Sequence, residues 1–202
     1  ESQLLASIMA KKHSVSSTHI LIDVPIGKDS KVKNMFEALK LKKEFEEIGR
    51  RLKKHVKVLI TDGSQPIGNG IGPALEARDV LWILKRDPRR PIDLEKKCLM
   101  MCSKIFDMLN VKDGHKKALE ILNSGKAYAK MIEIIKAQNG REIAAEDIKI
   151  GKYSYDVLST KSGRVSDMDN MLISRIARIA GAPTDKGAGI YLYKHIGDKV
   201  KR

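Results

Sequence analysis

The sequence predicts an α/β fold in which a mostly parallel sheet is flanked by helices and followed by a small α+β domain. Apolar runs at 20–24 and 56–61 flank a helical pattern at 34–54, and two strands joined by a crossover helix normally run parallel. After residue 148, short apolar alternations surround one helical pattern at 170–180. Three parts are therefore expected: a terminal helix at 1–17 belonging to a helical domain, a partial α/β domain at 18–140, and a truncated α+β domain at 141–202.

Apolar periodicity predicts the remaining helices, and turn residues mark their ends. Residues 2–13 carry an apolar stripe and finish in cations, which suit a helix C-terminus. The patterns at 74–84 and 94–109 predict two further helices, separated by a proline-containing break. Between 114 and 138 the pattern fits one helix or two, with Gly125 as the possible break.

The last part of the chain alternates in the way expected of short strands. Tyr153, Tyr155 and Val157 alternate with polar residues, and 190–193 forms a second apolar run. Residues 197–202 form a polar turn of the kind that leads into another strand, which the sequence does not contain.

Composition bounds the possible partners. The 202 residues carry a net charge of +14, with 32% charged and 42% hydrophobic residues. Such a basic balance suggests an anionic partner, although a lysine-rich surface of thermal adaptation would give the same charge. No apolar run reaches membrane-spanning length, and the first residues lack a signal-peptide pattern. We therefore expect a cytoplasmic protein without a membrane partner.

The cysteines and histidines do not predict a metal centre. Cys98 and Cys102 fall on one helix face within an apolar run, which predicts buried free thiols. Two thiols cannot complete a structural zinc site, and the histidines lack ligand spacing.

The most informative segment is 61–78, TDGSQPIGNGIGPALEAR, which follows a strand pattern and enters a helix at Pro73. It resembles the TD-x-SQP-hydrophobic-G…G-x-ALE segment of the thymidine/pyrimidine nucleoside phosphorylase family, and its ending is most similar to the archaeal AMP phosphorylases. Further resemblances follow in the family's order: SIMAKK at 7–12, ILIDVPIGKDSK at 20–31, and VSDMDNMLISRIARIAGAPTDKGAGIYLYKHIGDKVK at 165–201.

The resemblance implies phosphorolysis of an N-glycosidic bond, in which inorganic phosphate attacks C1′ and the base leaves. In the AMP phosphorylase branch the substrate is a nucleoside 5′-monophosphate and the product is ribose 1,5-bisphosphate. A thymidine or pyrimidine nucleoside phosphorylase is the alternative. The resemblance also implies a homo-oligomer that uses phosphate as a co-substrate and needs no organic cofactor.

Three substrate contacts follow from the resemblance. Ser7 matches a position that hydrogen-bonds the nucleobase, and Lys11 matches a base contact of the pyrimidine branch. Lys31 stands where the pyrimidine enzymes carry an apolar residue and the AMP phosphorylases carry a nucleotide-binding lysine. Without the motifs, Ser7 would bond within its own helix, and both lysines would be ordinary solvated cations.

Some pyrimidine phosphorylases hold a monovalent cation, potassium for example, beside the matching glycine loop. The corresponding groups are the carbonyls of Ile67 and Gly70 and the carboxylate of Asp79. The family usually has Glu at the last position, so a solvated helix residue is the other interpretation of Asp79.

The family's phosphate loop and catalytic aspartate do not occur in this sequence and are expected upstream of Glu1. No residue of this chain is therefore assigned a catalytic role. We expect a fragment, cut again before its last C-terminal strand or strands, that has no phosphorolysis activity alone.

Two other classes of protein fit parts of the pattern less well. A nucleic-acid-binding module would use the cations at 50–55, but these share a helix with glutamates, and 4% aromatic residues leave few stacking platforms. A dinucleotide-binding enzyme would need G-x-G-x-x-G directly after the strand, whereas Gly68, Gly70 and Gly72 follow a longer loop.

Overall fold

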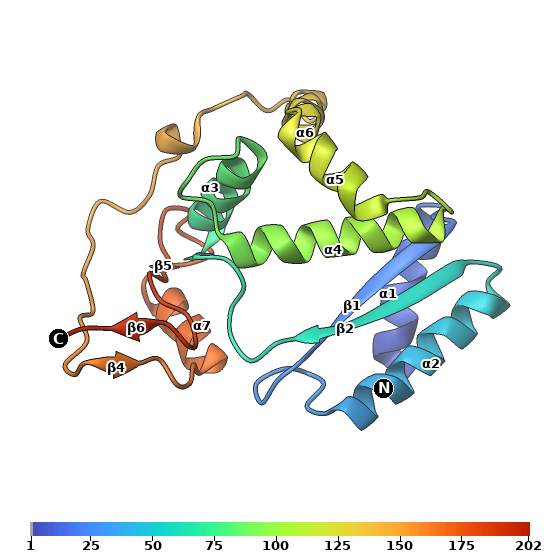
Figure 1. Cartoon of the computed structure of the whole chain (residues 1–202), viewed down its shortest axis with the longest axis horizontal. Helices are drawn as coiled ribbons and strands as arrows, with labels where there is room; N and C mark the ends of the chain where they lie inside the picture. The colour runs from blue at the N-terminus through green and yellow to red at the C-terminus, as the bar shows by residue number, and fades with distance from the viewer. Residues whose placement is uncertain (1) are drawn as a thin grey trace. The chain divides into compact units, whose positions relative to one another are not determined.

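The computed structural model describes residues 2–202, except for the side chains of Ser2 and Leu4, and its contacts group the chain into two compact units (Figure 1). Unit 1 contains the chain up to Ser64 together with 101–114, and unit 2 contains 65–100 together with 115–202. The units interleave along the sequence, so the division into parts at 17/18 and 140/141 stays a prediction.

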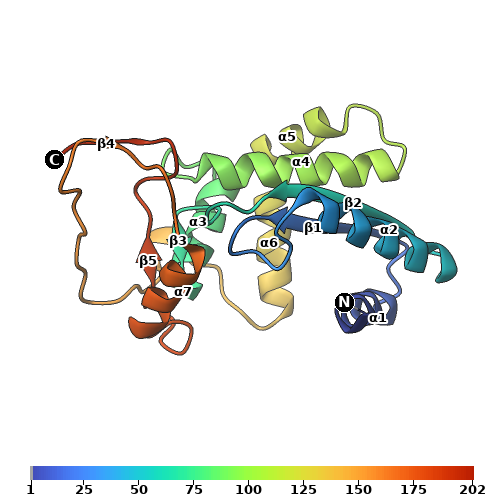
Figure 2. The same ribbon diagram turned by 90° about the horizontal axis from the view of Figure 1, so that it is seen from below.

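Unit 1 is built on a parallel βαβ arrangement, as the sequence predicts. Strand β1 (His19–Ile26) pairs in parallel with β2 (His55–Asp62), with His19 opposite His55, and helix α2 (Met35–Arg51) connects them. Helix α1 (Ser2–Ser14) precedes β1 and packs against α2, and α2 packs against β2 (Figures 1 and 2).

The core of unit 1 follows from the two side-chain periods, since alternate residues of β1 and every third or fourth residue of α2 face inward. Its buried members are Leu5, Met9, Ile20, Ile22, Val24, Ala38, Leu41, Phe45 and Val58. Two reciprocal hydrogen bonds, similar to those of a capping box, stabilise the start of α2. The Asn34 side chain accepts a hydrogen bond from the Glu37 backbone nitrogen at 2.9 Å, and the Glu37 carboxylate accepts from the Lys33 backbone nitrogen at 3.0 Å.

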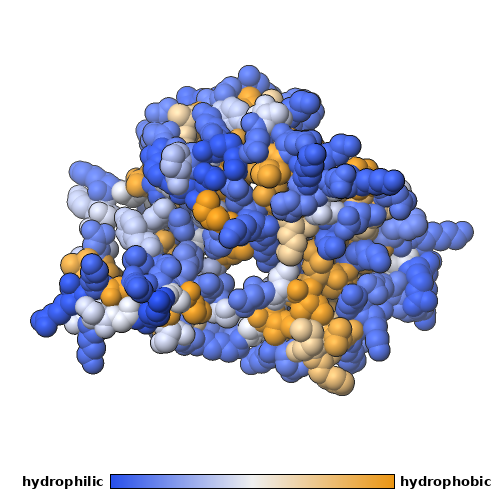
Figure 3. All heavy atoms as spheres, viewed as in Figure 1, coloured by the Kyte–Doolittle hydropathy of each residue, from blue (hydrophilic) through white to orange (hydrophobic). Residues whose placement is uncertain are grey.

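Hydrophobic residues gather in the part of Figure 3 occupied by the β1–β2 sheet and the first turns of α2. Met35, Phe36 and Leu39 at the start of α2 are exposed, and Phe36 is 80% exposed.

Unit 2 is mostly helical, with short antiparallel strand pairs. Strand β3 (Gly70–Ile71) pairs with β5 (Ile190–Tyr191), and β4 (Gly163–Arg164) pairs with β6 (Lys199–Val200). Its other elements are α3 (Pro73–Leu84), the start of α4 (Ile92–Met108), α5 (Gly114–Asn123), α6 (Lys126–Ala137), the 3-10 helix η1 (Ala145–Asp147) and α7 (Asn170–Ile179).

Most helix predictions are confirmed to within two residues at each end. The break between α5 and α6 lies at Gly125, whose φ of 75° is a left-handed conformation that glycine adopts without strain. The polar turn at 197–202 itself supplies β6, which the sequence pattern did not indicate.

The strand predicted at Tyr153, Tyr155 and Val157 is not formed. These side chains are 86%, 90% and 88% exposed, and no secondary structure is assigned from 153 to 159. Alternation alone does not make a strand, because a strand also needs a partner for its backbone groups. Among the helices of residues 2–202, none is long and apolar enough to cross a membrane.

Candidate functional site

The loop between β1 and α2 packs directly on the glycine-rich segment. The Gly63 nitrogen donates to the Ile26 carbonyl at 2.8 Å, and a Cβ added to Gly27 would lie 2.3 Å from the Gly63 carbonyl oxygen. The loop closes through a 3.3 Å hydrogen bond from Gly27 N to Val32 O, which leaves Lys31 exposed. Lys31 therefore follows the carboxyl end of β1, the edge at which open α/β sheets bind ligands.

The other two predicted substrate residues lie on α1. Ser7 and Lys11 are exposed and one helical turn apart, while Leu5 and Met9 of the same helix point into the core. The described hydrogen bonds and ion pairs do not join Ser7, Lys11 or Lys31 to one another. The structure thus places the three residues on two elements of unit 1.

A shallow groove of about 420 Å³ in unit 1 does not include these three residues. Residues of α1 and α2 line it, together with Leu52 just after α2. One carboxylate oxygen of Glu44 in this groove is buried without a hydrogen bond. The predicted contacts therefore do not coincide with this groove.

Beyond Ser64 the glycine-rich segment is organised around Asp79. This side chain is only 1% exposed, and its Oδ2 accepts hydrogen bonds from the backbone nitrogens of Asn69 at 2.8 Å and Gly70 at 2.7 Å. Burial raises the pKa of Asp79, and the two backbone bonds and the Arg78 charge oppose that rise. The interpretation of Asp79 as a solvated helix residue is therefore wrong, because the loop backbone converges on it.

The second oxygen of Asp79, Oδ1, is buried and has no hydrogen-bond partner. A buried carboxylate oxygen without a partner is costly, and a cation would offset that cost. Oxygen donors of this kind suit hard cations, and carbonyls with a single carboxylate supply little negative charge. The residues present are therefore compatible with a monovalent cation. In the part of the chain that the structure describes, no group of three or more His, Cys, Asp or Glu residues could hold a metal ion.

Gly72 makes the turn from β3 into α3. Its φ is 129°, and a Cβ added there would lie 2.4 Å from the Ala188 carbonyl oxygen, so both conformation and space require glycine. The Gly72 nitrogen donates to the Glu76 carboxylate at 2.9 Å, and Pro73 occupies the first helical position.

The C-terminal segment holds the same loop from the other side. The Asn69 side chain contacts Tyr191 Oη at 3.3 Å and His195 Nε2 at 3.0 Å. Gln65 Oε1 accepts a hydrogen bond from the Ile196 nitrogen at 2.7 Å. Local sequence patterns carry no signal for this connection, because more than 120 residues separate the partners.

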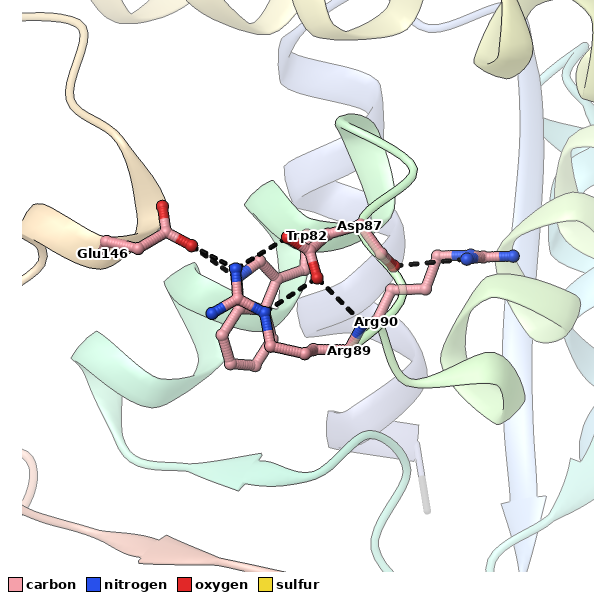
Figure 4. Close-up of polar contacts among 5 residues, drawn as sticks. All are labelled: Trp82, Asp87, Arg89, Arg90 and Glu146. Atoms are coloured by element: carbon pink, nitrogen blue, oxygen red, sulfur yellow. Dashed lines mark hydrogen bonds and ion pairs between the residues drawn. The ribbon is translucent and has the colours of Figure 1, made fainter.

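Trp82 of α3 organises a second polar cluster (Figure 4). Two guanidinium groups contact its buried ring, with Arg78 at 4.6 Å and Arg89 at 4.7 Å from the ring centroid. Arg89 also binds Asp87 through two side-chain bonds of 2.8 and 2.7 Å and pairs with Glu146.

This cluster explains the turn between α3 and α4. The hydrogen bonds from Arg89 lower the pKa of Asp87 to about 2. The partners of Trp82 come from its own helix, from the turn at 87–90 and from η1, which suits a structural role.

The prediction of buried thiols is also wrong. Cys98 and Cys102 are both exposed on α4. Their apolar neighbours suggested burial, but a spacing of four places both on the face that turns outward.

No protein-family model matches the chain. Among curated relatives, it is 48% identical over 202 residues to an AMP phosphorylase of Pyrococcus abyssi, covering 98% of this chain and 40% of the relative. It is 43% identical over 201 residues to a putative thymidine phosphorylase of Albidiferax ferrireducens, covering 98% of this chain and 38% of that relative. A protein of the same name from Nitrobacter hamburgensis is 45% identical over 203 residues, and the match covers 99% of this chain and 39% of that relative.

Over nearly its whole length the chain is similar to curated thymidine and AMP phosphorylases. It spans about two fifths of the length of the curated relatives it matches. Identity at this level over nearly the whole chain confirms the resemblance found from the separated motifs.

Proposed function

We propose that this chain forms part of an AMP phosphorylase, which cleaves a nucleoside 5′-monophosphate with inorganic phosphate to give ribose 1,5-bisphosphate and a free base. The position of Lys31 carries the proposal. It is an exposed cation on a loop fixed at the carboxyl end of β1. A 5′-phosphate is the part of the substrate that distinguishes a nucleotide from a nucleoside, and a lysine can supply the charge that recognises it.

The other predicted contacts have roles that suit this reaction. The Ser7 hydroxyl can donate to or accept from the edge of the base, and Lys11 lies one turn further along the same helix face. Orienting the base and sugar in line with the attacking phosphate contributes to catalysis by positioning. We assign no proton transfer to this chain, and we expect it to show no phosphorolysis alone.

A potassium-like cation is proposed at Asp79, together with the carbonyls of Ile67 and Gly70. The buried, unpartnered Oδ1 of Asp79 supports it. Such an ion would act on loop geometry, since Asp79 already holds the backbone of this loop. A homo-oligomeric, cytoplasmic enzyme remains the expected state.

A chimera tests the nucleotide proposal. Residues 1–202 replace the matched segment of the Pyrococcus abyssi AMP phosphorylase, and base release is measured with AMP, adenosine and thymidine. The chimera should prefer AMP. Lys31→Ala should raise the KM for AMP by roughly tenfold or more, as expected for loss of one charged hydrogen bond, and should leave the KM for adenosine unchanged.

Lys33→Ala is the matched control, since it removes an exposed lysine on the same loop whose side chain has no assigned role. An active chimera whose AMP preference survives Lys31→Ala would contradict the proposal. Preference for thymidine over AMP would favour a thymidine phosphorylase, the function named for the relatives from Albidiferax ferrireducens and Nitrobacter hamburgensis.

A further inference from the structure

Two histidines meet at the amino ends of β1 and β2, the strands that lie side by side in Figure 1. His19 begins β1, His55 begins β2, and the parallel register places the two residues directly opposite one another. Their rings are stacked, with centroids 4.7 Å apart and planes inclined by 14°. The two residues are far apart in the sequence, so only the fold brings these imidazoles together.

Both rings lie on the sheet face that is turned away from the core of unit 1. Ile20 and Val56, the next residue of each strand, pack in that core, and successive side chains of a strand point to opposite faces. His55 is exposed and His19 is half-buried. The hydrophobic core therefore does not hold either ring.

Thr18 organises both histidines. Its carbonyl accepts a hydrogen bond from the His55 backbone nitrogen at 2.9 Å, and its Oγ1 lies 3.0 Å from His19 Nδ1. When Nδ1–H donates to this hydroxyl, the lone pair of the ring is on Nε2, and a hydrogen bond at the other ring nitrogen is the usual way in which a metal-ligating histidine is oriented. Within residues 2–202, the His55 ring makes no side-chain hydrogen bond or ion pair. Each ring therefore has a nitrogen available as a ligand.

We propose that His19 and His55 chelate a divalent late transition-metal ion, Zn²⁺, Ni²⁺ or Cu²⁺. Imidazole nitrogens suit these ions, whereas Mg²⁺ and Ca²⁺ take oxygen ligands. The two rings turn about their Cβ–Cγ bonds so that both lone pairs point at one ion. Water completes the coordination, since the described chain contains no group of three or more His, Cys, Asp or Glu residues that could hold a metal.

The charges nearby predict a moderate affinity. Lys54 precedes His55, and Lys57 lies on the same strand face as His55, so a cation binds here against positive charge. An ion held by both strands links their amino ends, and it should stabilise unit 1 in proportion to its occupancy.

This site is separate from the two already described. It lies at the opposite end of β1 from the loop that carries Lys31, a distance of roughly 20 Å along an eight-residue strand. It also differs in chemistry from the oxygen donors around Asp79. The proposal therefore does not depend on the proposed enzymatic function.

Titration calorimetry of the 202-residue chain tests the site. Cys98 and Cys102 are first replaced by serine, because exposed thiols bind the same ions. One Zn²⁺ or Ni²⁺ ion should bind per chain, and Mg²⁺ should not replace it. His19→Ala and His55→Ala should each weaken binding by roughly tenfold or more, because either change removes one of two ligands. His115→Ala, which removes an exposed histidine on α5, is the matched control and should leave the affinity unchanged.

Nuclear magnetic resonance of the imidazole groups gives a second measurement that needs no histidine variant. Of the five histidines, only His19 and His55 should change their ring signals when Zn²⁺ is added. Thr18→Val should weaken binding by roughly tenfold, because the hydroxyl that orients His19 is lost. No bound ion, binding that survives both alanine substitutions, or ring signals that change at the other histidines instead would each overturn the proposal.

Discussion

Asp79 Oδ2 accepts a 2.7 Å hydrogen bond from the backbone nitrogen of Gly70, and this bond ties α3 to the loop that precedes it. The same oxygen accepts a second bond from Asn69. One buried carboxylate therefore fixes the backbone of the glycine-rich segment at 69–70, just before it enters the helix.

Asp79→Ala should destabilise unit 2 by about 2–4 kcal/mol, because it removes the acceptor of two buried backbone donors. The measurement is urea unfolding followed by the fluorescence of Trp82, the only tryptophan, which lies on the same helix. Asp93→Ala is the matched control. It removes a single bond, to the Gly68 nitrogen, from an exposed side chain. Equal losses in the two variants would contradict the anchoring role of Asp79.

Gly72→Ala should lower the free energy of unfolding by about 2–4 kcal/mol, because alanine is strained at a φ of 129° and its Cβ would meet the Ala188 carbonyl oxygen. Gly163→Ala provides the comparison, since nothing lies within 4 Å of a Cβ added there. The difference between the thermal midpoints of the two variants measures the cost. Similar midpoints would show that the turn can relax.

The ionised Asp87 carboxylate should stabilise the fold, and this stabilisation should be lost in acid. Its folded pKa, about 2, lies below its ordinary value of 3.8, so the stabilisation is present above pH 3.8 and is lost as the pH falls toward 2. Trp82 fluorescence should report this loss, because Arg89 contacts both residues. In the Asp87→Asn variant, the change in Trp82 fluorescence between pH 3.8 and 2 should be smaller. An unchanged acid profile would assign the transition to other carboxylates.

Asp79 titrates in the opposite sense. Burial raises its pKa, so the folded state keeps a proton that the unfolded state has lost, and stability from this group falls as the pH rises above 3.8. Asp79→Asn should remove that dependence while still offering an acceptor oxygen to the loop. The test is the slope of unfolding free energy with pH, and an unaltered slope would show that Asp79 is not its source.

Two phenylalanines of α2 give a matched pair for the core of unit 1. Phe45 is 1% exposed and Phe36 is 80% exposed. Phe45→Ala should therefore cost about 3–5 kcal/mol, whereas Phe36→Ala should change stability by less than about 0.5 kcal/mol. Amide hydrogen exchange of β1 and β2 measures the stability of unit 1, because both strands belong to that unit. A large loss from Phe36→Ala would reveal packing that its exposure does not indicate.

The sequence predicted local structure well, because helix periodicity, caps and breakers act within a few residues. The βαβ arrangement, the break at Gly125 and the helix starting at Pro73 all follow from such signals. Apart from the two thiols of α4, the errors concern partners that are distant in sequence. Asp79 is buried by a loop that folds back on it, and the alternating residues around Tyr155 have no strand beside them.

The motifs predicted which residues belong to the candidate site. They did not predict which contacts hold those residues in place. Lys31 could be singled out from the motif, but the contact that holds its loop could not. The connection from Asn69 to His195 had no sequence signal, since neither residue is unusual in its local context. Long-range polar contacts of this kind require the folded chain.

The close approach of Gly27 and Gly63 has an evolutionary consequence. The two loops meet through main-chain atoms, so replacing the exposed residue at position 31 leaves their spacing intact. A lineage can thus exchange a cation for an apolar group at this corner without rebuilding the sheet beneath it. Under the role proposed for Lys31, substrate selectivity and the packing of the two loops are therefore separately adjustable at this point of the fold.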